Sequence, residues 1–342
     1  MITKEETMRL KGVAILMMLF LHLFNTDERM GLCHPLVSLG DKPLVHLIAR
    51  FSALCVPIYI FLSGYGLSFI YHKTAGLQMR TANRILRLYT NYWIVFLLFI
   101  PLASWVNPTE YPSDLTTLLL NVTALSDSYN LEWWFLMPYM LLVLVSPWII
   151  RNVHALNGKQ ATVCCVVLMA FYLLLHPLRG MCPFFAGKDF VFNIGLLIFP
   201  FVSGIVFSHH AVLDRFRNWT TQRWGAHKDR YLWALLMVFF LLRIFIKTGA
   251  INAVYGLIFI TLFTATDRNS WCNFLLGHLG KHSTNMWLTH TFFSWYLFAD
   301  FFYGLQYPLL MYVVLIAVSL CTSYFIQLLN RPLQERIKRL PF

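Results

Sequence analysis

The chain has 342 residues, of which 58% are hydrophobic and 12% charged, and its formal net charge is +12. Soluble globular proteins average roughly 45–50% apolar and about 25% charged residues, so this composition excludes an ordinary soluble protein. The apolar residues form long blocks separated by short polar stretches, which is typical of helices that cross a membrane. We therefore expect an all-α integral membrane protein.

The apolar blocks follow one another along the chain and predict about ten transmembrane helices. A straight span needs ~20 residues, so the shorter blocks must extend into their flanks. A further apolar stretch at 118–125 is too short to cross and is expected at the membrane interface. The blocks lie at 12–25, 45–71, 88–106, 133–150, 161–176, 190–207, 231–246, 251–266, 285–299 and 310–329.

The positive charges predict the orientation of these spans, because Lys and Arg gather in cytoplasmic loops. With the N-terminus inside, most of the 27 Lys and Arg residues fall in cytoplasmic segments, whereas the acidic residues favour the outer ones. An odd number of spans would destroy this separation, so both termini are expected in the cytoplasm. The net positive charge is then a consequence of topology and indicates no nucleic-acid partner.

The seven cysteines are an odd number, include no Cys-x-x-Cys pair and lie mostly within apolar blocks. We interpret them as small packing residues, and we expect no metal site. The N-terminal segment has basic residues before an apolar stretch but lacks the small residues of a signal-peptide cleavage site. It is therefore interpreted as the first span. No polar stretch is long enough to form a second domain.

The first apolar block begins in the stretch KGVAILMMLFLH, which runs from Lys11 to His22. Because each helical residue turns about 100°, these two side chains share one face and lie about 16 Å apart along the axis. An ionisable group at membrane depth is costly and is a candidate for function. A neutral imidazole there would suit a general base. The alternative is a histidine that is hydrogen-bonded within the bundle or lies near the outer headgroups.

The basic stretch after the second block places Arg80, Arg84 and Arg87 on one helical face. These like charges repel one another, so an anion is expected to compensate them. That anion is either a lipid headgroup or a phosphorylated ligand bound through the guanidinium groups. The alternative is the ordinary enrichment of basic residues in a cytoplasmic loop.

Two apolar blocks contain polar residues that also have a plain structural interpretation. Ser63 and Tyr65 lie in FLSGYGLSF, where small residues permit close packing of helices. Trp134 lies in LEWWFLMPYM beside Glu132, where an aromatic belt at the membrane interface is expected. Neither stretch predicts function when taken alone.

The stretch LGKHSTNMWLTH lies at the cytoplasmic start of the ninth block. Its Ser283 is a residue type that often caps a helix, which is the plain interpretation of this position. His290 lies deeper in the same block and is a second histidine at membrane depth.

Taken in order, these stretches resemble the acyltransferase 3 family of membrane-bound acyltransferases. The resemblance covers nearly the whole chain, although the family commonly has arginine where this chain has Lys11. Lysine keeps the charge but cannot form the two-pronged contact of a guanidinium group. The matching pieces are the pair Lys11 and His22, the SGY segment 63–65, the pair Arg84 and Arg87, the WFL segment 134–136, and GKHS at 280–283 followed by LTH at 288–290.

The resemblance implies a single transmembrane acyltransferase domain over residues 1–342. Some members of the family carry a fused extracytoplasmic domain, and we expect none here. It implies transfer of an acyl group, commonly acetyl from acetyl-CoA, to a hydroxyl of a cell-envelope sugar or polysaccharide precursor. His22 would be the general base, or would relay a proton around a covalent acyl intermediate. Other residues would bind the phosphates of the donor or line and support its channel. The first group is Lys11, Arg80, Arg84 and Arg87, and the second is Ser63, Tyr65, Trp134, Ser283 and His290.

The resemblance also implies the surroundings of the protein. It would be a multi-pass protein of the bacterial cytoplasmic (inner) membrane, in contact with membrane lipids. Its partners would be acyl-CoA and a glycan or lipid-linked sugar acceptor. A second copy of the chain and a separate extracytoplasmic transferase are further candidate partners.

Without the resemblance, the residues are also compatible with two other classes of function. A secondary transporter or exporter of a small molecule or glycan would suit many spans with polar groups inside. Such proteins often show matching halves with Gly- or Pro-interrupted segments, or acidic residues in mid-membrane, and neither is visible here. The hypothesis of a scaffold or glycan-binding membrane protein gives no functional role to Arg84 and Arg87.

Overall fold

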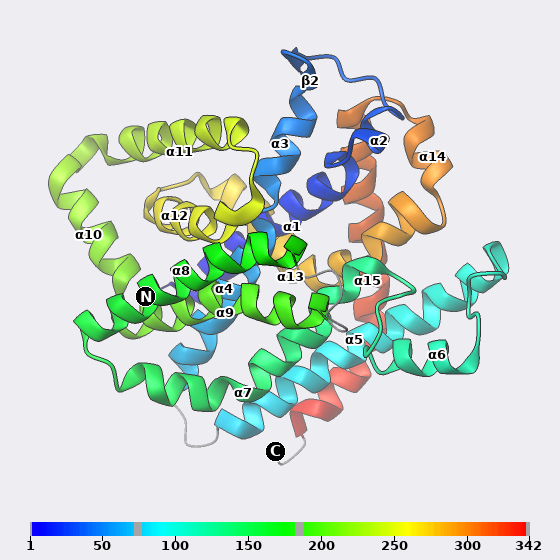
Figure 1. Cartoon of the computed structure of the whole chain (residues 1–342), viewed down its shortest axis with the longest axis horizontal. Coiled ribbons are helices and arrows are strands. Elements are labelled where there is room, and N and C mark those ends of the chain that lie inside the picture. The colour runs from blue at the N-terminus through cyan, green and yellow to red at the C-terminus, as the bar shows by residue number, and fades with distance from the viewer. Residues whose placement is uncertain (1, 72–76, 182–187, 340–342) are drawn as a thin grey trace. The chain divides into compact units, whose positions relative to one another are not determined.

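Most of the described residues belong to helices, as the composition predicts (Figure 1). The computed structural model describes residues 2–71, 77–181 and 188–339. Within these ranges, β1 (Ser38–Leu39) and β2 (Lys42–Pro43) form a short antiparallel hairpin between α2 and α3. The α-helices are α1 (Lys4–Phe24), α2 (Asp27–Met30), α3 (Leu44–Ser52), α4 (Cys55–Tyr71), α5 (Leu77–Val106), α6 (Leu115–Val122), α7 (Leu136–His154), α8 (Gly158–Met181), α9 (Lys188–His209), α10 (Val212–Trp224), α11 (Lys228–Phe245), α12 (Asn252–Ala265), α13 (Ser270–Thr291), α14 (Ala299–Gly304) and α15 (Pro308–Arg339). The 3-10 turns are η1 (Leu131–Phe135), η2 (Gly225–His227) and η3 (Gly249–Ile251), and η4 (Phe292–Tyr296) is π-helical.

Within the described part of the chain, seven helical segments are long and apolar enough to cross a membrane. They agree with an all-α, multi-pass membrane protein, while the count of ten spans and the cytoplasmic termini stay predictions. The other predicted spans correspond to α11, which has charged residues near both ends, to α12, which has only 14 residues, and to the more polar α13. The seven segments are Lys4–Phe24, Leu44–Tyr71, Thr81–Val106, Leu131–His154, Gly158–Leu178, Asp189–His209 and Pro308–Ile337.

The block predicted as one span at 45–71 is two helices in the structure, because α3 ends at Ser52 and α4 begins at Cys55. Pro57 accounts for the break. Its ring would clash with the carbonyl of Ala53, four residues earlier, and its nitrogen has no hydrogen to donate. The helix therefore restarts with the proline in its first turn.

The bounds predicted for the ninth span, 285–299, are wrong. Helix α13 begins at Ser270 and ends at Thr291, and η4 follows it directly. The helix starts earlier because the stretch 271–279 is largely apolar and extends the helical pattern backward. Ser283 consequently lies inside α13, so its interpretation as a helix cap is also wrong.

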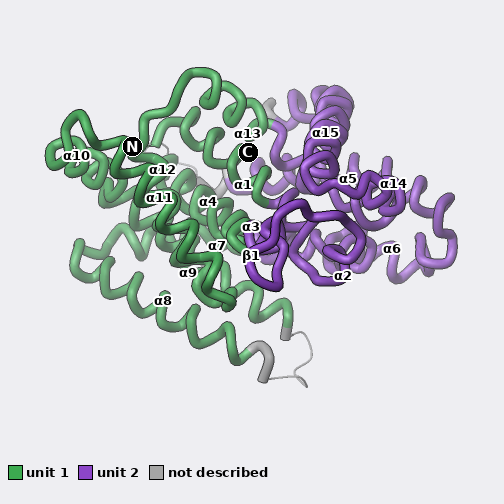
Figure 2. The backbone as a smooth tube through the Cα atoms, turned by 90° about the horizontal axis from the view of Figure 1, so that it is seen from above, with its two compact units in different colours: residues 1–17, 50–77, 142–281 green, residues 18–49, 78–141, 282–342 purple. Residues whose placement is uncertain are grey.

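The chain divides into two compact units (Figure 2). Unit 1 comprises Met1–Met17, Arg50–Leu77 and Leu142–Lys281. Unit 2 comprises Met18–Ala49, Gln78–Leu141 and His282–Phe342. Helices α1 and α13 contribute residues to both units, and each unit is described below by itself.

In unit 1, α1 and α13 approach each other through two glycines. A Cβ atom on Gly12 would lie 2.0 Å from the carbonyl oxygen of Leu276, and one on Gly280 would lie 1.8 Å from that of Met8. Real side chains do not tolerate such distances, so only glycine lets the two backbones come this close. Both helices then continue into unit 2, where they carry His22 and His290.

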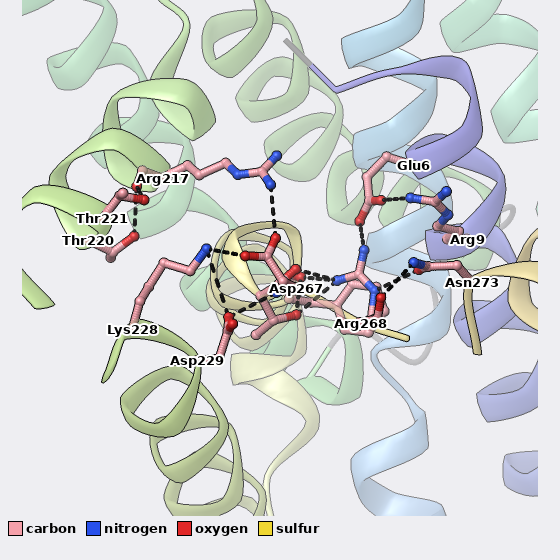
Figure 3. A network of polar contacts seen from close by, with 12 residues as sticks. Glu6, Arg9, Arg217, Thr220, Thr221, Lys228, Asp229, Asp267, Arg268 and Asn273 are labelled. Carbon is pink, nitrogen blue, oxygen red and sulfur yellow. Dashed lines mark hydrogen bonds and ion pairs between the residues drawn. The ribbon is translucent and has the colours of Figure 1, made fainter. Parts of the chain in front are cut away.

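Ion pairs connect the first turns of α1 to the segment between α12 and α13 in unit 1 (Figure 3). Glu6 pairs with Arg268, and its second oxygen lies 2.9 Å from Nη1 of Arg9. The side chains of Glu6 and Arg268 are 11% and 4% exposed, so this pair is buried. The same residues border a polar cavity of about 280 Å³.

The next residue in this segment, Asp267, connects two further helices of unit 1. Its carboxylate lies 2.7 Å from Nζ of Lys228 on α11 and 3.1 Å from Nη2 of Arg217 on α10. The hydrogen bond from Lys228 holds the pKa of Asp267 below its ordinary value. The segment between α12 and α13 is therefore held from three sides by charged contacts.

We expect Glu6→Ala to lower the thermal midpoint of the detergent-purified protein by several degrees. Removing one partner of a buried pair leaves the other charge uncompensated, at a cost of about 3–5 kcal/mol. The matched control is Glu5→Ala, since Glu5 also pairs with Arg9, at 3.5 Å, but is 81% exposed. Exposed pairs contribute about 0.2–1 kcal/mol, so the control should melt close to wild type. Equal midpoints for the two variants would contradict the assigned importance of the buried pair.

Candidate functional site

The histidine at the end of the first apolar block faces a carboxylate in unit 2. His22 lies in the last turn of α1 and is 8% exposed. Its Nε2 lies 3.2 Å from Oε2 of Glu132, whose side chain is also largely buried. When Glu132 is ionised it can only accept, so Nε2 of a neutral imidazole carries the hydrogen. The basic lone pair is then on Nδ1.

Glu132 is presented by η1, a short 3-10 segment that is held on α13. Asn130 caps η1, since its side chain accepts a hydrogen bond from the backbone N–H of Glu132 at 3.1 Å. The Asn130 amide also donates to Oγ1 of Thr291 at 2.8 Å. The indole of Trp133 donates to the carbonyl of Leu288 at 3.1 Å. These contacts fix the carboxylate relative to the end of α13.

His290 lies close to His22 near the end of α13. The two imidazole centroids are 5.1 Å apart, and His290 is fully buried. Its Nδ1 lies 2.8 Å from the carbonyl oxygen of Trp287 and 3.2 Å from that of Met286. Carbonyl oxygens only accept, so Nδ1 carries the hydrogen and Nε2 carries the lone pair.

Both lone-pair nitrogens are buried, and among the described residues neither has a hydrogen-bond partner. These atoms are Nδ1 of His22 and Nε2 of His290. Buried polar atoms are normally hydrogen-bonded, and the exceptions require an explanation. Two neighbouring acceptors without donors form a site suited to a substrate that brings its own O–H or N–H group.

Two of the three arginines predicted to bind phosphate, Arg84 and Arg87, have described side chains and lie on α5 in unit 2. Nε of Arg84 donates to the hydroxyl of Tyr139 at 2.9 Å. The buried Nε of Arg87 has no hydrogen-bond partner among the described residues, and no carboxylate in that part of the chain pairs with its guanidinium group. The Arg87 carbonyl accepts from the Gln334 amide of α15 at 3.3 Å. Arg87 therefore offers a positive charge to an anion.

The other predicted site residues are spread over both units. Lys11, Ser63 and Tyr65 belong to unit 1, whereas Trp134 in η1 and the buried Ser283 in α13 belong to unit 2. Ser63 and Tyr65 are buried on α4, and the Tyr65 hydroxyl accepts a hydrogen bond from the backbone nitrogen of residue 2 at 3.0 Å.

The cluster of His22, Glu132 and His290 in unit 2 thus brings together only some of the residues that the sequence singled out. It contains His22 and His290, with Trp134 next to Glu132 in η1. The side chain of Arg80 lies outside the described residues.

The comparisons with known proteins decide the family. A family model described as an acyltransferase domain, Acyl_transf_3, matches residues 9–328, which is nearly the whole chain. The chain belongs to the acyltransferase 3 family. Comparison with curated proteins and with solved structures finds no match. The protein is therefore a multi-pass membrane acyltransferase, and the family favours acyl transfer over the transporter hypothesis.

Glu132 is a residue of the candidate site that sequence reasoning missed. It lies beside two tryptophans and was interpreted as part of an interfacial aromatic belt. The predicted topology contained part of a signal, because alternating span directions place His22 and Glu132 toward the outer ends of their spans, whereas the predicted bounds 285–299 place His290 nearer a cytoplasmic end. An acidic residue at the same depth as a histidine is a candidate partner for it.

We expect Asn130→Ala to destabilise this acyltransferase by about 1–3 kcal/mol, the cost of leaving buried partners unsatisfied. The substitution removes the cap of η1 and the bond to Thr291 together. Asn107→Ala is the control, because Asn107 lies in the same unit and its side chain accepts an exposed hydrogen bond from Thr109. Thermal midpoints in detergent measure the difference. Equal midpoints for the two variants would show that the Asn130 contacts do not stabilise the fold.

Proposed function

We propose that this acyltransferase moves an acetyl group from acetyl-CoA to a hydroxyl of a cell-envelope sugar or polysaccharide precursor. His22 is the general base, and the protein resides in the bacterial cytoplasmic membrane. The observation that supports this proposal best is the pairing of His22 Nε2 with Glu132 at 3.2 Å, while the buried Nδ1 has no hydrogen-bond partner in the described part of the chain. A carboxylate that orients an imidazole in this way selects its tautomer and stabilises the imidazolium.

The proposed reaction needs one base that later acts as an acid. Nδ1 of His22 takes the proton from the acceptor hydroxyl while the hydroxyl oxygen forms a bond to the thioester carbonyl carbon. The carbon–sulfur bond of the thioester then breaks, and the leaving CoA thiolate takes the proton back from Nδ1. The products are the acetyl ester and free CoA, and the imidazole returns to its neutral form.

His290 would orient the acceptor in this scheme. Its Nδ1 hydrogen is committed to the carbonyls of Met286 and Trp287, so Nε2 has a fixed lone pair. A second hydroxyl of the same sugar can donate to that nitrogen. Sugars carry neighbouring hydroxyl groups, so two adjacent acceptor nitrogens suit this class of substrate.

The donor phosphates would bind at Arg87 and Arg84. The guanidinium of Arg87, whose Nε has no hydrogen-bond partner among the described residues, suits an anionic oxygen, because charge-assisted hydrogen bonds to phosphate are strong. With the termini in the cytoplasm, these arginines lie at the face where CoA is present. Arg80 and Lys11 stay proposed contributors to the same anchor. A lipid-linked sugar acceptor, a second copy of the chain and a separate extracytoplasmic transferase stay proposed partners.

We expect His22→Ala to lower turnover of radiolabelled acetyl-CoA by about 10²–10⁴-fold, the usual contribution of a general base. Glu132→Gln should give a smaller loss, since the imidazole remains but its orientation is less constrained. Binding of acetyl-CoA should be unchanged in both. His34→Ala, which changes an exposed histidine of the same unit, is the control. Full activity of His22→Ala would overturn the assignment of the base.

We expect the double variant Arg84→Ala/Arg87→Ala to raise the dissociation constant of acetyl-CoA by at least tenfold. A hydrogen bond to a charged group contributes about 1.5–3 kcal/mol, and two such groups are removed. Arg331→Ala is the control, because Arg331 lies on α15 of the same unit, is 77% exposed and already pairs with Glu335. Equilibrium binding in detergent measures both. An unchanged constant in the double variant would place the phosphate anchor elsewhere.

A further inference from the structure

The carbonyl oxygen of His22 receives two hydrogen bonds from distant side chains. The last four carbonyls of a helix have no partner within the helix. In α1, the His22 carbonyl accepts from Nη1 of Arg29 at 2.9 Å and from Nε1 of Trp295 at 3.0 Å. The backbone of the proposed base is therefore held on two sides.

Arg29 and Trp295 also contact each other. The guanidinium carbon lies 3.5 Å from the centroid of the indole ring, which is a close cation–π contact. Arg29 is fixed by its own surroundings as well, since Thr26 caps the short helix α2 and accepts from the Arg29 backbone nitrogen at 3.4 Å. The side chains of Arg29 and Trp295, which both donate to the His22 carbonyl, therefore support each other's positions.

Trp295 also restricts the rotation of the His22 imidazole by direct ring contact. The indole and imidazole centroids are 5.3 Å apart and the rings meet nearly edge to face, at 74°. Trp295 lies in the π-helical turn η4, and such turns are frequent at functional sites. With Glu132 on Nε2 and His290 at 5.1 Å, the imidazole has contacts that restrict its rotation.

We propose that Arg29 and Trp295 form a clamp that positions His22 for catalysis. The inference rests on the proposed function of His22 as base. The clamp holds the carbonyl of His22 and one edge of its ring, while Glu132 holds Nε2. The lone pair of Nδ1 therefore keeps a fixed orientation. Neither clamp residue touches the reacting atoms in this proposal, and both act through His22.

The first test is kinetic. Trp295→Ala should lower kcat about 10²-fold, as expected when a catalytic group moves by about 1 Å, with an unchanged KM for acetyl-CoA. Trp295→Phe, which keeps a ring but loses the N–H group, should recover part of kcat. Arg29→Lys should lower kcat by a smaller factor than Trp295→Ala, because the ammonium keeps the charge but not the planar stacking group. The control is Trp105→Ala, since Trp105 is 82% exposed in the same unit.

A double-variant cycle separates positioning from a general structural role. In the His22→Ala background, Trp295→Ala should cause no further loss of residual activity, because the clamp has no base to position. A loss that adds fully to that of His22→Ala would overturn the proposal. Thermal midpoints of the single variants serve to exclude unfolding as the cause.

The second test does not depend on transferase activity. Diethyl pyrocarbonate labels imidazole nitrogens, and peptide mass spectrometry of the full-length protein reports the rate at each histidine. Trp295→Ala and Trp295→Phe should raise the labelling rate of His22 several-fold, while exposed His34 serves as the internal reference. An unchanged rate at His22 would overturn the clamp. A raised rate in a protein that shows no acetyl transfer would leave the clamp in place and refute the proposed function instead.

Discussion

Polar groups inside this protein must find partners on other parts of the protein or on a bound substrate, because the lipid around a membrane helix offers no hydrogen bonds. The end of α1 shows the consequence most clearly. Its last carbonyls accept side-chain hydrogen bonds from four residues that lie elsewhere in unit 2. The pairs are His22 with Arg29 and Trp295, Leu23 with Tyr303, and Phe24 with His46. The turn that carries the proposed base is thereby fixed by the same bonds that complete the helix.

Hydropathy and charge were sufficient to predict the all-α class and the position of most helices. They failed where the backbone is interrupted or where polarity masks a helix. Pro57 breaks an apolar block that hydropathy alone reads as continuous. In α13, Lys281 and His282 interrupt the apolar pattern, so the helix was placed too late in the chain. Apolar content measures burial, whereas helix bounds depend on backbone hydrogen bonds.

The candidate site could be predicted only in part for a related reason. His22 and His290 stand out because each is an ionisable group within a long apolar stretch. Glu132 and Trp295 do not, since acidic and aromatic residues are ordinary at the ends of membrane spans. What distinguishes them is a contact with His22 across 110 and 273 positions of sequence. Such pairing is a property of the fold and leaves no local pattern.

When both imidazoles are neutral and Glu132 is ionised, the positive charge of Arg29 and the negative charge of Glu132 balance within unit 2. Accepting a proton at His22 leaves one uncompensated positive charge in a buried place, where solvation by water is weak. That charge disappears only when the proton leaves again. In the proposed reaction the nearest acceptor is the departing thiolate. Charge balance would therefore couple the two proton transfers in time and keep the protonated enzyme short-lived.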